Sequence, residues 1–168
     1  VTFTNKAAKE MLVRIAAQLP INHRGMWVGT FHGLCNRFLK KHYQEANLPQ
    51  VFQILDSADQ KSAIKRVMKQ MNVDEDFLPS KEVLYFINAN KEEGIRSHAF
   101  KSFDDISEKK NEIYKAYENQ CLKEGVVDFA ELLLRCLELF QNKPMIREHY
   151  QSIFQHILVD EFQDTSKL

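Results

Sequence analysis

The sequence predicts a mainly α-helical fold, in which a helical domain is flanked by a few parallel strands of an incomplete α/β domain. Between residues 56 and 154, apolar residues recur at helical spacing between capping and helix-stopping residues. Short apolar or β-branched runs occur at residues 1–4, 26–30 and 156–160, near the two ends of the chain. Together these patterns predict strand pieces that enclose an inserted helical region.

The first two strands are each followed at once by a helix. After residues 1–4, apolar residues at helical spacing begin at Asn5, with Thr4 or Asn5 as the cap and Pro20 as the stop. After residues 26–30, a second helix begins at Phe31. This arrangement predicts two strand-to-helix units at the start of the chain.

Five helices are predicted in the middle of the chain, each from a start or stop signal. The start signals are Asp56-Ser57, Pro79-Ser80, Ser107, Asp128 and Pro144, and the stop signals are Gly94 and Gly125. Asp128 and Glu131 also have the spacing of a capping box. The chain then returns to strand character at residues 156–160.

Composition and charge limit the function classes. Hydrophobic residues make up 44% and charged residues 27% of the 168 residues, and no apolar run approaches the roughly 18 residues of a membrane span. This excludes a membrane protein, a collagen and a disordered tail. The net charge is zero, but seven cations and one anion give residues 1–42 a charge of +6. This clustering suggests a basic face for an anionic partner, with a solvated helix surface as the alternative.

Cysteine usage and the chain ends indicate the setting of the protein. Cys35, Cys121 and Cys136 are widely spaced and match no zinc-binding pattern, so we expect buried reduced thiols. The opening Val-Thr-Phe-Thr shows no secretory signal, which indicates a cytoplasmic protein. The chain also lacks an initiator Met and ends just after a predicted strand. We therefore expect a piece excised from a longer protein.

Acidic residues directly follow the last predicted strand. An Asp at such a strand end, here Asp160, is well placed to hold Mg²⁺ in nucleotide hydrolysis, and Glu161 could accept a proton from an attacking water. Acids that merely face solvent are the alternative. Because ligands of open α/β sheets bind beyond the carboxyl ends of strands, Thr4, Thr30 and Asp160 would lie at one edge.

The first two strand ends carry residues suited to nucleic acid. Helix N-termini favour phosphate, so Thr4 and Asn5 could contact a backbone while Phe3 stacks on a base. Gly29-Thr30-Phe31-His32-Gly33 repeats this arrangement, with Thr30 and His32 as polar contacts. The alternatives are ordinary helix caps, a core aromatic residue and a surface histidine.

Four segments in order along the whole chain resemble successive motifs of UvrD/Rep-type superfamily I DNA helicases. They are Thr2-Phe3-Thr4-Asn5-Lys6-Ala7-Ala8, Gly29-Thr30-Phe31-His32, Asp128-Phe129 with Leu132-Leu133-Leu134, and Asp160-Glu161-Phe162-Gln163-Asp164-Thr165. The resemblance implies an ATP-driven motor that moves 3′ to 5′ on single-stranded DNA and separates duplex DNA. It also implies a partial RecA-like domain at residues 1–54 and 155–168, interrupted by a helical insertion at residues 55–154.

The resemblance also implies roles for individual residues. Phe3, Thr4 and Asn5 match the first single-strand contact motif, and Thr30 and His32 match the second. Asp160 matches the Mg²⁺ ligand, Glu161 the base that activates water, and Gln163 a link between the nucleotide and DNA sites. The family commonly has Tyr at Phe162 and Ser at Gly33, so two hydroxyl groups are absent here.

No phosphate-binding loop of the form Gly-x-x-x-x-Gly-Lys-Ser/Thr occurs in the sequence. We therefore expect a helicase fragment that is inactive alone, whose parent uses ATP and Mg²⁺ and acts on single-stranded and duplex DNA. One alternative is a non-catalytic DNA-binding or protein-interaction scaffold with helicase-like sequence. Another is the motor part of a helicase-nuclease subunit.

Overall fold

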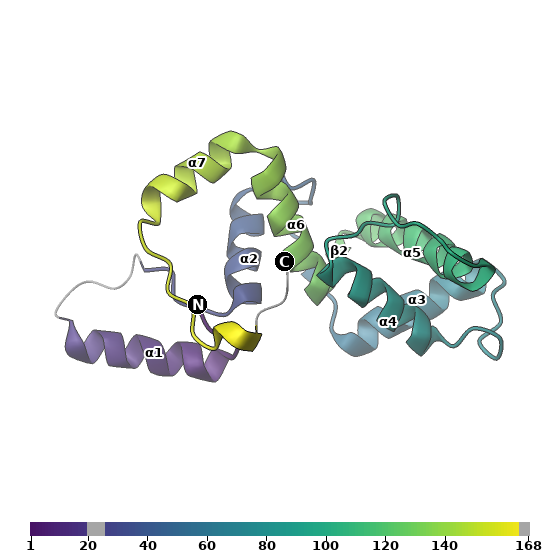
Figure 1. The fold of residues 1–168 in the computed structure, drawn as a ribbon, viewed down its shortest axis with the longest axis horizontal. Helices are drawn as coiled ribbons and strands as arrows, with labels where there is room; N and C mark the ends of the chain where they lie inside the picture. Colours follow the sequence, from purple (N-terminus) through teal and green to yellow (C-terminus); the bar gives the residue numbers. More distant parts are fainter. Residues whose placement is uncertain (20–25, 165–168) are drawn as a thin grey trace.

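The computed structural model describes residues 1–19 and 26–164, and this part of the chain is mainly helical (Figure 1). The predicted stop at Pro20, the cation Arg24 and the motif residue Thr165 lie outside the described residues. The helices are α1 (Asn5–Gln18), α2 (Phe31–Lys41), α3 (Ser57–Gln70), α4 (Ser80–Glu92), α5 (Asp105–Glu124), α6 (Phe129–Asn142), α7 (Pro144–Ile153) and the short 3-10 helix η2 (Phe162–Asp164). No helix among the described residues is long and apolar enough to cross a membrane.

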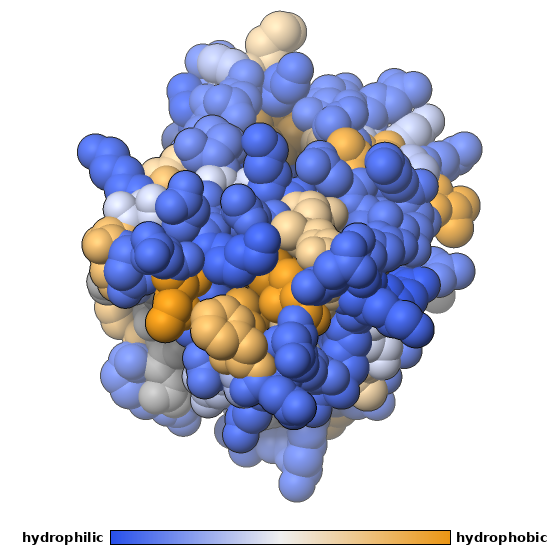
Figure 2. Space-filling view, turned by 90° about the vertical axis from the view of Figure 1, so that its right-hand side faces the viewer, coloured by the Kyte–Doolittle hydropathy of each residue, from blue (hydrophilic) through white to orange (hydrophobic). Residues whose placement is uncertain are grey.

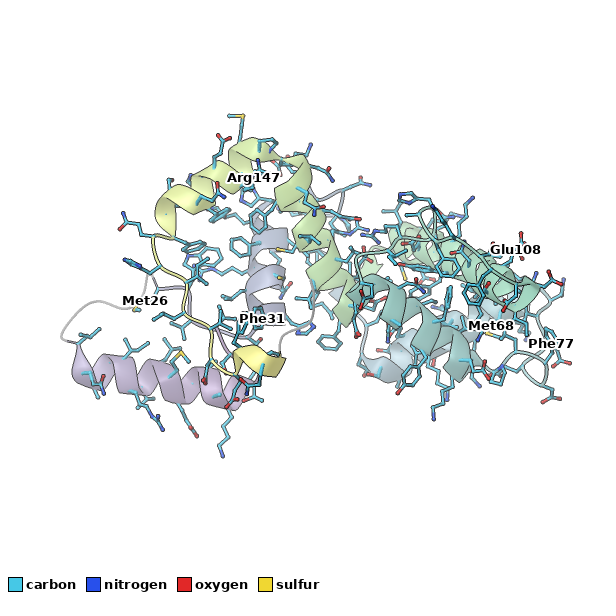
Figure 3. The ribbon with its side chains drawn as sticks, viewed as in Figure 1. Met26, Phe31, Met68, Phe77, Glu108 and Arg147 are labelled. Carbon is cyan, nitrogen blue, oxygen red and sulfur yellow. The ribbon has the colours of Figure 1, made fainter. Side chains whose placement is uncertain are left out.

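Helices α3, α4 and α5 form a three-helix lobe at one end of the molecule (Figure 1). Its core consists of apolar side chains from the inner faces of the three helices, including the fully buried Ile64, Ile87 and Tyr114. Figure 2 shows this end of the molecule as mostly hydrophilic, with a small apolar patch. In Figure 3, Met68 lies among the helices of the lobe and Phe77 at its far tip, where the Phe77 side chain is 72% exposed.

A second core joins α2 to α6. Leu39 of α2 is fully buried against Leu132 and Leu139 of α6, and the segment after α2 adds Phe52. All three thiols are free, but the predicted burial is complete only for Cys136, which lies in this core, while Cys35 and Cys121 are half-buried. Helix α6 therefore packs on α2 as well as bordering the lobe.

A two-stranded parallel sheet forms the neck of the lobe. Strand β1 (Gln53–Ile54) precedes α3 and strand β2 (Val126–Val127) follows α5, with Gln53 opposite Val126. The flanking backbone adds the Leu55 N–H bond to the Val127 carbonyl at 2.8 Å. The chain therefore enters and leaves the lobe along two paired strands.

The predicted helix signals are confirmed at most positions. The side chains of Thr4, Asp56 and Asp128 each accept a backbone N–H at the start of a helix, and Pro144 opens α7. Gly125 ends α5 with φ of +66°, a left-handed conformation that glycine adopts without strain. Helix α5 begins two residues before the predicted Ser107, because the Asp104 side chain caps it and forms a capping box with Ser107.

The prediction of strands at residues 1–4, 26–30 and 156–160 was wrong, because none of these segments forms a regular strand. These segments lie side by side, but they pair through one isolated bridge, Thr2 with Thr30, and through backbone hydrogen bonds of Val1 to Leu158 and Asp160. They border an apolar groove of about 420 Å³, and the Leu158 side chain is 83% exposed. Without a packed layer over them, the extended segments gain too little burial to form a regular ladder.

The capping box predicted at the start of α6 is half correct. Asp128 accepts the Glu131 N–H at 2.8 Å, as a cap does. The Glu131 carboxylate instead binds the cations Lys91, Arg96 and Arg135. An ion pair with three cations is stronger than a bond to one backbone N–H, so tertiary contacts override the local motif.

Candidate nucleic-acid and nucleotide site

The first candidate DNA segment lies at the start of α1. The Thr4 hydroxyl accepts the Ala7 N–H at 3.1 Å, so this residue caps the helix. Phe3 just before the cap is 40% exposed, and Asn5 in the first turn is exposed as well. An aromatic ring and the polar start of a helix are therefore available side by side.

The second candidate segment lies at the start of α2 and is joined to the first. Thr30 caps α2 by accepting the Gly33 N–H at 3.1 Å. Thr2 forms the parallel bridge to Thr30, and the rings of Phe3 and Phe31 are 5.4 Å apart (Figure 3 labels Phe31 at the start of α2). The fold thus brings together two segments that are distant in the sequence.

The acidic segment, which begins at Asp160, pairs with Val1, just before the first candidate segment in the sequence. The Asp160 N–H donates to the Val1 carbonyl at 2.9 Å. Asp160 and Glu161 therefore lie close to the backbone of the first candidate segment. Asp160 and Glu161 are exposed, and the Glu161 N–H donates to Asp160 Oδ1 at 3.1 Å. Gln163 of η2 donates its side-chain amide to the Glu161 carboxylate. The three predicted residues of this segment therefore interact directly.

Glu161 has an unusual backbone conformation. Its φ of +54° is left-handed, a conformation that few residues other than glycine adopt. Such conformations cost about 1–3 kcal/mol and persist where the surroundings impose them, often at functional sites. The turn directs the chain from the extended segment into η2.

The donor types at Asp160 suit Mg²⁺. This ion prefers carboxylate and phosphate oxygens and is commonly bound through one or two carboxylates together with waters and nucleotide phosphates. Asp160 offers an exposed carboxylate of this kind, and Glu161 lies next to it. Within the described residues no cluster of three or more His, Cys, Asp or Glu side chains could hold a metal.

Phe129 adds an aromatic ring that the sequence did not assign to the site. It is the first residue of α6, its side chain is 49% exposed, and its ring lies edge-on to His32 with centroids 5.7 Å apart. The rings of Phe3 and Phe31 are adjacent at the starts of α1 and α2. Aromatic rings therefore lie at or next to the starts of α1, α2 and α6, and ring contacts join α2 to each of the other two helix starts.

Burial lowers the pKa of His32 below its ordinary value of 6.5, while the Glu92 carboxylate acts in the opposite direction. The half-buried ring is therefore neutral at neutral pH. A neutral imidazole can donate one hydrogen bond and accept another, but it does not attract phosphate by charge. His32 is thus suited to contact a base or a sugar.

The described cations of the basic region, residues 1–42, are exposed in two different settings. Lys6, Lys9 and Arg14 of α1 are exposed to solvent. Arg37 lies over the Trp27 ring at 3.8 Å and Lys41 over the Tyr150 ring at 5.3 Å. The lysines of α1 are nearest in sequence to Phe3 and remain the better candidates for phosphate contacts.

A buried ion network holds the start of α6 against the three-helix lobe. Lys91 of α4 is 2% exposed and bonds Asp128 at 2.6 Å and Glu131 at 2.9 Å. Arg96 binds both oxygens of Glu131 and also reaches Glu118 and Glu138. Burial acts to lower the pKa of Lys91, but the Glu131 and Asp128 carboxylates outweigh it, so this pKa is raised and Lys91 stays charged.

Comparison with known proteins identifies the family. The sequence model described as "UvrD/REP helicase N-terminal domain" matches residues 1–168. The chain belongs to this helicase family. The match covers every segment described above, so the resemblance predicted from four motifs is confirmed.

Relatives of the UvrD/REP chain are named as DNA helicases. DNA helicase II of Salmonella typhimurium strain LT2 is 51% identical over 169 residues, which cover 100% of this chain and 24% of that protein. DNA helicase II of Haemophilus influenzae is 50% identical over 173 residues, also 24% of its length. ATP-dependent DNA helicase PcrA of Bacillus subtilis is 34% identical over 172 residues, covering 99% of this chain and 23% of PcrA. The chain thus spans about a quarter of the length of these relatives.

The sequence analysis did not predict that Lys91 forms buried ion pairs or that the Phe129 ring contacts His32. Val83, Ile87 and Lys91 are spaced four residues apart, which places Lys91 on the buried face of α4. A lysine on an apolar stripe, together with the acids Asp128 and Glu131, was the available signal for a buried ion pair. Phe129 stood in a quoted motif, but only the fold brings its ring to His32.

Proposed function

We propose that this chain forms part of an ATP-dependent DNA helicase, in which it supplies single-strand contacts and the acid pair that serves ATP hydrolysis. The observation that carries the proposal is the pairing of Thr2 with Thr30 on one side and of Val1 with Asp160 on the other. Through this pairing, a DNA contact by Phe3 or His32 is separated from the acid pair by only a few residues of backbone. The names of the relatives agree with this function.

The proposed roles follow from the chemistry of each group. Asp160 would hold Mg²⁺, an ion that would supply positive charge to the nucleotide phosphates, and Glu161 would accept a proton from the attacking water. Gln163 bonds the Glu161 carboxylate and is the proposed link to the DNA side. Phosphate binding requires a loop that is not among these 168 residues, so the isolated chain is expected to show no ATP hydrolysis.

Phe3, Thr4, Asn5, Thr30 and His32 are the proposed DNA contacts, and Phe129 joins them. The support is their common location at the starts of α1, α2 and α6 and the exposure of the two phenylalanine rings. We propose movement in the 3′ to 5′ direction from the family resemblance. We also propose the division into a motor domain at 1–54 and 155–168 with an insertion at 55–154. The paired neck strands enclose residues 55–125 of this range and support its first boundary.

The deciding experiment for hydrolysis uses the full-length helicase that contains this chain. Glu161→Gln is expected to lower ATP turnover by about 10²- to 10⁴-fold while ATP binding is retained, because it removes a general base without removing Asp160. Glu148→Gln, which changes an exposed carboxylate on α7, is the matched control and should leave turnover unchanged. Normal turnover in Glu161→Gln would favour a non-catalytic scaffold instead.

A salt titration tests the DNA contacts in the same protein. Phe3→Ala is expected to weaken single-strand binding by a factor that salt hardly changes, because base stacking is worth about 1–3 kcal/mol per base and does not depend on ions. Lys6→Ala should instead flatten the salt dependence. Phe77→Ala removes a more exposed ring from the tip of the lobe, 72% exposed against 40% for Phe3, and serves as the control. Unchanged binding in Phe3→Ala would remove the stacking role.

A further inference from the structure

The Asp128 carboxylate is shared between the start of α6 and the three-helix lobe. Its Oδ1 atom accepts the Glu131 N–H at 2.8 Å and so caps α6. Its Oδ2 atom accepts the Lys91 ammonium at 2.6 Å and the Tyr117 hydroxyl at 2.8 Å. Asp128 is 1% exposed, so these protein groups hold it in place of water. One side chain thus connects α4, α5 and α6.

The residue after Asp128 carries the exposed ring of the proposed DNA face. Phe129 is the first residue of α6 and contacts His32 of α2 edge-on. Because a cap fixes the direction in which a helix begins, the position of Asp128 determines where the Phe129 ring lies. Groups that hold Asp128 therefore act on the Phe129–His32 contact without touching it.

We propose that Tyr117 and Lys91 are positioning residues for single-strand binding: through Asp128 they fix the first turn of α6, so that Phe129 stays beside His32. The three-helix lobe then sets the geometry of the DNA face from the opposite side of α6. This inference rests on the proposed DNA-binding function. It adds a role for two buried residues that lie outside the motifs.

The chain offers a matched pair of variants for the test. Tyr114 and Tyr117 are both fully buried on α5, and each hydroxyl donates one hydrogen bond. The Tyr114 hydroxyl bonds the Ile95 carbonyl at 3.1 Å, whereas only that of Tyr117 bonds Asp128. Changing either tyrosine to Phe keeps the ring and its packing, so both variants are expected to fold. Their comparison separates a general loss of stability from a loss of positioning.

The experiment measures binding of the full-length protein to a fluorescent single-stranded oligonucleotide, well below the melting temperature of each variant. Tyr117→Phe is expected to weaken binding by about three- to tenfold, a part of the effect of removing a stacked ring. Tyr114→Phe is expected to bind normally. In a Phe129→Ala background, Tyr117→Phe should cause no further loss, because the ring that it positions is already absent.

Three outcomes would overturn the inference. One is equal weakening in Tyr114→Phe and Tyr117→Phe, which would show a general stability effect. Another is an undiminished Tyr117→Phe effect in the Phe129→Ala background. The third is normal binding in Phe129→Ala, which would remove that ring from the DNA face. The proposed function itself fails separately, if Phe3→Ala and Phe129→Ala both bind DNA normally.

Discussion

Lys91 shows how single residues in this protein depend on remote partners. Its ammonium group is fully enclosed, and a buried charge is tolerated only when it is paired and hydrogen-bonded. Asp128 and Glu131 meet this requirement from α6. The ion pairs that compensate the burial of Lys91 therefore exist only while the lobe and α6 stay together.

Replacing Lys91 with Met should destabilise the protein strongly. The change leaves two buried carboxylates without one of their cations, and breaking a buried pair in this way costs about 3–5 kcal/mol. Lys65→Met, which removes an exposed pair with Glu75 at 2.9 Å, should cost at most about 1 kcal/mol. Urea unfolding of both variants measures the difference. Equal stability of the two would show that water or Arg96 replaces the lost cation.

At the scale of elements, the neck of the lobe depends on the exact end of α5. Gly125 stops this helix in a left-handed conformation, and its carbonyl then accepts the Gln53 N–H at 3.1 Å. The helix stop and the first bond of the β1–β2 pair therefore involve the same residue. An ordinary local signal, a glycine after a helix, sets the start of the tertiary pairing.

Gly125→Ala is expected to lower the free energy of unfolding by about 1–2 kcal/mol, the cost of a left-handed conformation in a residue with a Cβ atom. That Cβ atom would also lie 3.1 Å from Cγ of Pro49. Gly125→Asn should cost less, because asparagine adopts this conformation more readily. Thermal melts compare the two. If Asn and Ala are equally destabilising, the contact with Pro49 outweighs the backbone effect.

At the scale of the whole molecule, the described residues form two buried cores, and α6 lies between the lobe and α2. The three-helix lobe has its own core, and α2 shares a second one with α6. Residues 1–4 and 157–160, which carry parts of the first DNA motif and of the acidic segment, lie outside both cores, and among the described residues they pair through one bridge and a few backbone bonds. Local stability should therefore differ between the cores and the motif segments.

Hydrogen exchange of the isolated chain should follow this division. Backbone amides in the buried parts of α3 to α6, from Ile64 to Phe140, are expected to exchange slowly. Amides of residues 1–4 and 157–160 should exchange much faster, since few packed side chains protect them. Mass spectrometry of peptides at a series of times measures both. Uniform protection across the chain would contradict the two-core description.

Much of the helical fold could be read from the sequence, because helix signals are local. Thr4, Asp56 and Asp128 each cap the helix that directly follows, and Gly125 ends the one before it. The bonds involved join residues at most four positions apart, so neighbours in the sequence contain the information. The candidate site residues were predicted in the same way, since they lie at or just after the ends of the short segments 1–4, 26–30 and 156–160, and their roles stay predictions.

Tertiary structure decided which residues act together. Whether residues 1–4 pair as a ladder depends on burial by segments elsewhere in the chain. Here the described residues form the bridge from Thr2 to Thr30 and the backbone bonds of Val1, but no regular ladder. Glu131 had the spacing of a local cap partner, yet Lys91 and Arg96 bind its carboxylate. Strand pairing and buried charge depend on groups that are distant in the sequence, and no local pattern specifies where those groups meet.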